Sequence, residues 1–147
     1  MNIHSILVPV DYSPCSAAAV TFAVELASQL GAELDVVHVW DRPAYVSDDI
    51  KVGHPGDARS LFELIRENAQ AEMTQFMGKL ALPTTVKAST RLLSGNPAAT
   101  VLKALQAGKH QLLVVGTHGR TGLRHMLLGS VAEKLVRLSP VPVLVVP

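Results

Sequence analysis

Three glycines and a serine near the carboxyl end of the chain have the types and spacing to bind an anion. They stand as Gly116-x2-Gly119-x9-Gly129-Ser130. Glycine permits positive φ and close backbone approach, so consecutive N–H groups can converge on a phosphate. Gly129 and Ser130 also open a predicted helix, whose first N–H groups and dipole favour negative charge. The stretch therefore predicts a phosphate cradle that includes the Ser130 hydroxyl; a glycine-rich turn followed by an ordinary helix cap is the alternative.

The charges of the chain are unevenly distributed along it. The formal net charge is +1, yet residues 1–86 carry 11 acids against 5 bases, and residues 87–147 carry 8 bases against the single acid Glu133. Such asymmetry suggests an anionic partner, although two halves that interleave in the fold would also produce it. Arg120 and Arg124 lie inside the glycine-rich loop. We therefore interpret the asymmetry as one small anion site plus solvated surface.

An acidic side chain stands where it can face this loop. Asp11 follows directly on the apolar run Ile3–Val10, and the glycine-rich loop follows directly on the run Gln111–Gly116. In an open α/β sheet, ligands bind beyond the carboxyl ends of the strands, at the point where the winding reverses. Asp11 is therefore expected across a crevice from the glycines; capping of the following helix is its alternative role.

The elements that position these residues follow from the hydrophobic pattern. Unbroken apolar runs are typical of strands buried on both faces, and they alternate here with segments of helical period. This order predicts one Rossmann-like α/β domain over residues 1–147, with an open five-stranded parallel sheet in the order 3-2-1-4-5 and four helices on both faces. Residues Asp41–Gly56 lack periodicity and are expected to form a long loop, either a functional lid or a mobile segment. The predicted strands are Ile3–Val10, Glu33–Trp40, Thr85–Leu93, Gln111–Gly116 and Val141–Val146, and the predicted helices are Pro14–Leu30, Asp57–Leu80, a third from Asn96-Pro97 to near Gly108 and a fourth from Gly129-Ser130 to before Ser139.

Composition and missing motifs exclude several classes of protein. The chain has 147 residues, of which 48% are hydrophobic and 17% charged, a composition that excludes a disordered protein. It has no apolar stretch of about 18 residues, the length needed to span a membrane, so a membrane-spanning protein is excluded as well. An N-terminus without Lys or Arg, and one cysteine, Cys15, favour the cytoplasm over secretion. His118 and His125 lack the pairing of a metal site, and no Walker loop is present. Only 4% of the residues are aromatic, so the chain offers few side chains on which bases could stack, and nucleic acid is a poor candidate partner.

Three separated motifs in the right order resemble the universal stress protein family over the whole length of the chain. They are the opening ILVPVDYS at 6–13, the glycine motif at 116–130 and the closing PVPVLVVP at 140–147, and His38-Val39 at the end of the second strand agrees with them. The resemblance implies the adenine nucleotide alpha hydrolase-like form of the fold. It also implies membership of the branch that keeps the full glycine motif and binds an adenine nucleotide.

By position, the resemblance implies a role for each part of the crevice. Asp11 would contact the ribose or base, and Val39 would present main-chain groups to the adenine edge. Val115, Gly116 and Gly119 would line the ribose and first phosphates. The segment 129–131 would line the phosphate tail. The ligand would be ATP, ADP or AMP, with Mg²⁺ as a companion of ATP. The full candidate set is Pro9, Val10, Asp11, Val39, Val115, Gly116, Thr117, His118, Gly119, Arg120, Gly129, Ser130 and Val131.

The last predicted strand is a candidate interface between two copies of the chain. Residues 140–147 carry no charge, and the fifth strand in this order lies at the edge of the sheet. An uncharged hydrophobic edge invites pairing with another chain, and the resemblance also points to dimers through this strand. Cover by the chain's own helices is the alternative. The predicted interface residues are Val141, Val143, Leu144, Val145 and Val146.

Three functional hypotheses remain open on the sequence. The first is a stress-response protein that binds an adenine nucleotide and acts as a dimeric, nucleotide-dependent regulator. The second is a slow ATP hydrolase or a phosphoryl or nucleotidyl transferase in the same pocket, which ranks lower because no general base or metal pair is evident. The third is an interaction module without nucleotide, against which the intact glycine spacing argues.

Overall fold

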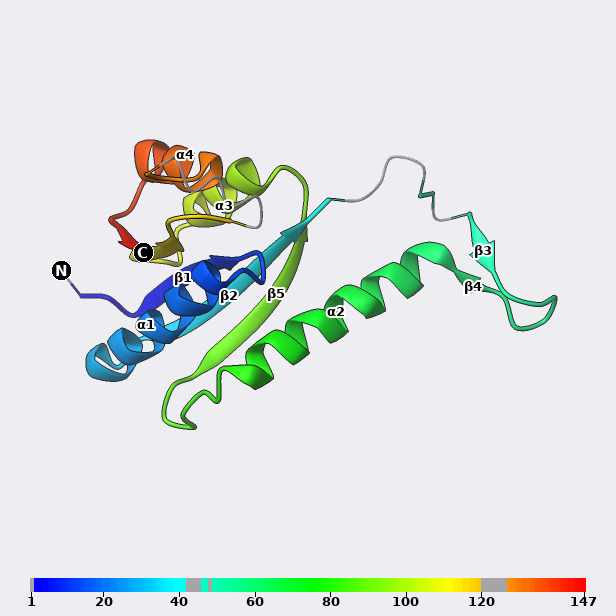
Figure 1. Ribbon diagram of the computed structural model, residues 1–147, viewed down its shortest axis with the longest axis horizontal. Helices are drawn as coiled ribbons and strands as arrows, with labels where there is room; N and C mark the ends of the chain where they lie inside the picture. The colour runs from blue at the N-terminus through cyan, green and yellow to red at the C-terminus, as the bar shows by residue number, and fades with distance from the viewer. Residues whose placement is uncertain (1, 42–45, 48, 120–126) are drawn as a thin grey trace.

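A five-stranded parallel sheet forms the centre of the protein (Figure 1). The computed structural model describes residues 2–41, 46–47, 49–119 and 127–147. Arg120, Arg124 and His125 therefore lie outside the described residues. The strand order is β5-β2-β1-β6-β7, which is the predicted order 3-2-1-4-5. The strands are β1 (Ser5–Val10), β2 (Glu33–Trp40), β5 (Ala88–Ser94), β6 (Leu112–Gly116) and β7 (Val143–Val146).

Capping residues mark the start of two helices and the end of one. In α1 (Pro14–Leu30), the Ser13 hydroxyl accepts a hydrogen bond from the Ser16 N–H at 3.2 Å, and Gly31 ends the helix at φ +65°. Asn96 caps the Ala99 N–H in the same way. The described ranges also hold the helices α2 (Leu61–Lys79), α3 (Pro97–Gln106) and α4 (Ser130–Leu138). Within the described ranges, no helix has both the length and the apolar character to cross a membrane.

Alternate residues of the central strands build two separate cores. On β1, the fully buried Ile6 and Val8 join the core beneath α1 and α2, whereas Leu7 joins the core beneath α3 and α4. Strand side chains alternate between faces, so both sets must be apolar when helices cover both sides of the sheet. This arrangement explains the unbroken apolar runs and leaves the strand ends as the place for polar chemistry.

The segment between β2 and α2 differs from the expectation. The predicted helix Asp57–Leu80 begins only at Leu61. Its expected first turn instead holds the short strand β4 (Arg59–Ser60), which pairs antiparallel with β3 (Lys51–Val52) of the predicted loop. Gly53 has φ +128°, and a Cβ there would lie 2.9 Å from the Asp57 carbonyl oxygen, so the turn requires glycine. Figure 1 shows the hairpin beyond the N-terminal end of α2, away from the sheet. Two-residue strands are too short to show a period, which is why the sequence pattern concealed them.

Ion pairs between neighbouring strands explain part of the charge asymmetry. Lys87 pairs with Glu33, and Arg91 on β5 pairs with Asp35 on β2. Each pair joins a base of the positive half of the chain to an acid of the negative half. The two halves thus interleave at the β2–β5 boundary, and these two bases need no external anion to account for them.

Candidate functional site

The carboxyl ends of β1 and β6 border a cavity of about 350 Å³. Every residue of the predicted set that the structure describes lines it, and Arg120 lies outside the described residues. These residues come from the ends of three strands, from the loop after β6 and from the first turn of α4. The structure therefore brings the predicted set together around one cavity, and ligand contact by each member stays a prediction. The twelve are Pro9, Val10, Asp11, Val39, Val115, Gly116, Thr117, His118, Gly119, Gly129, Ser130 and Val131.

Among the residues that the structure describes, five more line the cavity, and none of these was predicted from the sequence. Ser16 and Pro97 stand in the first turns of α1 and α3. The topology could have indicated both, because a helix that follows a parallel strand begins at the carboxyl edge of the sheet. Val101, Ala132 and Leu135 are buried helix positions whose sequence pattern is that of ordinary core residues.

The glycine-rich loop lies directly against the opposite wall of the cavity. A Cβ on Gly119 would stand 2.5 Å from Oδ2 of Asp11, and a Cβ on Gly116 would stand 2.8 Å from the Cys15 backbone. Gly129 packs on the same loop, where a Cβ would lie 3.3 Å from the Thr117 carbonyl oxygen. The three glycines thus permit close approach of separate elements, which is a packing reason for their presence that holds without any ligand.

Asp11 is held by its own turn and leaves the capping of α1 to another residue. Its Oδ1 accepts a hydrogen bond from the Ser13 N–H at 3.0 Å, while Ser13 itself caps α1. The intervening Tyr12 has φ +64°, a left-handed conformation that few non-glycine residues adopt. The turn therefore presents the carboxylate to the cavity wall formed by Gly119.

The N-terminus of α4 borders the cavity, and its N-cap residue is a glycine, which has no side chain to cap the helix. Its N-cap residue is Gly129, whose own N–H donates to the Thr117 carbonyl at 2.7 Å. Helix geometry leaves the next N–H groups, those of Ser130, Val131 and Ala132, without partners inside the helix. All three residues line the cavity. Backbone donors and the positive end of the helix dipole therefore meet at one wall, which suits an anion.

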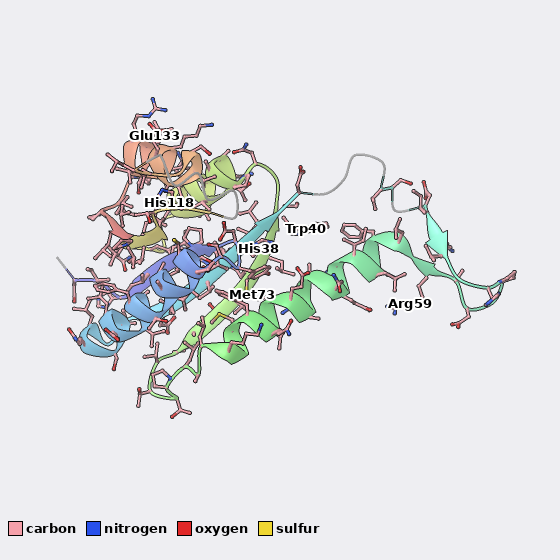
Figure 2. All side chains as sticks on the ribbon, viewed as in Figure 1. His38, Trp40, Arg59, Met73, His118 and Glu133 are labelled. Atoms are coloured by element: carbon pink, nitrogen blue, oxygen red, sulfur yellow. The ribbon has the colours of Figure 1, made fainter. Side chains whose placement is uncertain are left out.

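His118 completes the loop wall beneath α4 (Figure 2). Its Nδ1 lies 3.1 Å from the hydroxyl oxygen of Thr117, so that the two side chains support each other on the β6–α4 loop. Among the residues that the structure describes, no three His, Cys, Asp or Glu side chains gather to hold a metal ion. The arrangement of these residues suits binding through backbone donors, one carboxylate and apolar walls.

Comparisons with known proteins agree with this architecture. The universal stress protein family matches residues 2–147. A universal stress protein of Methanocaldococcus jannaschii is 36% identical over 96% of this chain and 80% of its own length, and one of Bacillus subtilis is 34% identical over 97% and 98%. The solved structure of UspA from Lactobacillus plantarum superposes with a TM-score of 0.75 at 26% identity, covering 100% of this chain and 99% of that one. The chain belongs to the universal stress protein family.

Proposed function

We propose that the protein binds an adenine nucleotide, ATP, ADP or AMP, in the cavity at the carboxyl ends of β1 and β6. We further propose that it acts as a dimeric, nucleotide-dependent regulator in the stress response. The observation that carries the proposal is the N-terminus of α4, which opens at a glycine without a capping side chain and borders the same cavity as Asp11. The anion-binding donors and the hydroxyl-binding carboxylate that a nucleotide needs therefore share one space.

Each part of a nucleotide has a suitable wall in this cavity. The phosphates would meet the N–H groups of Ser130 and Val131, and the ribose hydroxyls would donate to the Asp11 carboxylate. The adenine ring would lie toward Val39, whose backbone can pair with its edge, and against apolar side chains such as Val101. With ATP as the ligand, Mg²⁺ would accompany the phosphates and neutralise part of their charge.

Ligands of related structures are of the same chemical class. A universal stress protein was solved in complex with cAMP, and one from Archaeoglobus fulgidus with dAMP. These proteins are 22% and 19% identical to this chain, with TM-scores of 0.66 and 0.62, so the likeness is one of fold. For this chain, the support is its own cavity and the donors that line it.

The direct test is to identify what the purified protein carries. We expect mass spectrometry of the denatured protein to find adenine nucleotide, and added ATP, ADP or AMP to raise the melting temperature. Gly129→Val should carry no nucleotide and show no thermal shift. Its branched side chain would press on the Thr117 carbonyl oxygen and occupy space beside the first N–H groups of α4. Absence of released nucleotide together with absence of a thermal shift in the wild type would contradict the proposal. In the samples with added ATP, formation of ADP above that of a blank without protein would favour the alternative function of a slow ATP hydrolase.

The edge strand β7 provides a separate test of the dimer. Pro142 and Val146 direct their carbonyls to β6, so the odd-numbered Val143 and Val145 direct their backbone groups to the open edge. We expect Val145→Pro to give a monomer in light scattering, because it removes one N–H from that edge and leaves the β6 pairing in place. Val145→Ala keeps the N–H and is expected to remain a dimer. A dimer that survives Val145→Pro would exclude pairing through this edge.

A further inference from the structure

His38, near the carboxyl end of β2, contacts the residues on both sides of Asp11. Its Nδ1 lies 2.7 Å from the Val10 carbonyl oxygen, and its ring stacks on Tyr12 with centroids 4.3 Å apart and planes inclined by 28°. A carbonyl oxygen only accepts, so Nδ1 carries the proton and donates. Figure 2 labels His38 on β2. The His38 side chain thus contacts Val10 and Tyr12, the residues directly before and after Asp11, whose carboxylate lines the cavity.

The conformation of Tyr12 makes these contacts necessary. A φ of +64° is unfavourable for a side chain of this size, and surrounding contacts must hold such a residue in place. The Tyr12 ring lies between His38 and Phe76 of α2, with a centroid distance of 5.2 Å to Phe76. The stacked rings therefore hold the turn in its left-handed form on the face of the sheet opposite α3 and α4.

The direction of the Asp11 carboxylate depends on that turn. Its Oδ1 accepts from the Ser13 N–H, which is two residues further along and therefore moves with Tyr12. Its Oδ2 points at the place where a Cβ of Gly119 would stand. A change of φ at Tyr12 would turn the carboxylate relative to the glycine loop and alter the cavity wall.

We propose that His38 is a positioning residue for nucleotide binding, which aims the Asp11 carboxylate into the cavity through Val10 and Tyr12. The proposal rests on the proposed function. His38 lines no part of the cavity itself, and its side chain acts from β2 on the β1–α1 turn. It differs in this from its neighbour Val39, which lines the cavity directly.

Two substitutions separate the two contacts of His38. His38→Phe keeps a ring for Tyr12 and removes the donor to the Val10 carbonyl. His38→Asn keeps an N–H donor near the Nδ1 position and removes the ring. We expect the Kd for ADP to rise about fivefold in His38→Phe, which corresponds to the loss of one hydrogen bond. In His38→Asn the rise should be smaller, because an N–H donor is retained. His54→Phe, on the exposed hairpin, is the control and should bind as the wild type does.

A double-mutant cycle with Asp11→Ala distinguishes positioning from general support of the fold. If His38 acts through the carboxylate, His38→Phe should add no further loss of ADP affinity once the carboxylate is gone. An equal loss in both backgrounds would overturn the proposal. Comparable melting temperatures of the single variants ensure that folded proteins are compared.

A measurement without ligand separates this proposal from the proposed function. Hydrogen exchange of the Ser13 amide reports its bond to Asp11 directly. We expect exchange to be faster in His38→Phe than in the wild type and in His54→Phe. If the wild type binds no nucleotide, the proposed function is wrong. The exchange rate of the Ser13 amide needs no ligand, so it still decides whether His38 holds the turn. Unchanged Ser13 protection in His38→Phe would overturn the positioning role.

Discussion

Gly119→Ala is expected to weaken adenine-nucleotide binding by about tenfold or more, equivalent to about 1.4 kcal/mol. The added Cβ would stand 2.5 Å from Oδ2 of Asp11, a distance at which one of the two must move. The carboxylate cannot turn freely, because its Oδ1 accepts from the Ser13 N–H. Either that bond breaks or the loop after β6 moves outward, and both changes displace a wall of the cavity. We also expect the free energy of unfolding to fall by about 1 kcal/mol, the value of one lost hydrogen bond, because Gly119 is exposed and the crowded atom is the end of a side chain.

Titration calorimetry with ADP and urea unfolding measure the two effects separately. Gly78→Ala is the matched control, because a Cβ at this position in α2 has no atom of the described residues within 4 Å. It should leave the affinity unchanged and raise stability by up to about 1 kcal/mol through helix propensity. In an Asp11→Ala background, Gly119→Ala should cost less stability, since the clashing oxygen is gone. Wild-type affinity in the Gly119→Ala protein would show that the close approach to Asp11 is unimportant for binding.

The layered fold could be predicted because its rules act over short stretches of sequence. The run 6–8 is apolar at every position, and Ile6 and Leu7 are buried on opposite faces, as a sheet covered on both sides requires. Ser13-Pro14 and Asn96-Pro97 mark helix starts through local capping chemistry. The strand order then follows from connection rules, which is why the two walls of the cavity could be paired before the structure was known.

Features that depend on contacts between distant residues were beyond prediction. Glycine spacing indicated a permissive loop, but only the structure shows that Gly119 must clear the Asp11 carboxylate. The positive φ of Tyr12 has no local signal, because it depends on His38 and Phe76 from two other elements. Such contacts join residues far apart in the chain, and no periodicity records them.

The largest stability effect is expected at a charge cluster on the α3 side of the sheet, in which His110 is buried, Asp35 is partly buried and Arg91 is exposed. Asp35 on β2 accepts from Arg91 on β5, at 2.6 Å from Nη2 to Oδ2, and from His110 Nε2 at 3.0 Å. Burial alone would raise the pKa of Asp35, but the hydrogen bonds and charges of His110 and Arg91 lower it from 3.8 to about 2. The carboxylate is thus ionised throughout the neutral range and joins three separate segments of the chain.

Because the pKa of Asp35 is lowered in the folded protein, the free energy of unfolding decreases as the solution becomes acidic. A carboxyl with a pKa near 2 in the folded protein and near 3.8 in the unfolded chain stabilises the fold above about pH 4. That contribution is lost as the pH falls from about 4 through 2, since the unfolded chain then binds the proton more tightly. Because solvent screens part of the interaction, we expect the loss to amount to about 1 kcal/mol.

Asp35→Ala is expected to lower the free energy of unfolding at pH 7 by about 3 kcal/mol, measured by urea titration. The large effect arises because Arg91 loses its carboxylate and His110 keeps no partner: its Nδ1 is buried and already lacks a hydrogen bond among the described residues. Asp35→Asn retains the shape and should cost less, while its stability should no longer fall through this group between pH 4 and 2. Glu33→Gln removes the exposed pair with Lys87 and should cost about 0.5 kcal/mol. If Asp35→Ala cost no more than Glu33→Gln, the cluster would be a surface ion pair in energetic terms, and the fold would not depend on it.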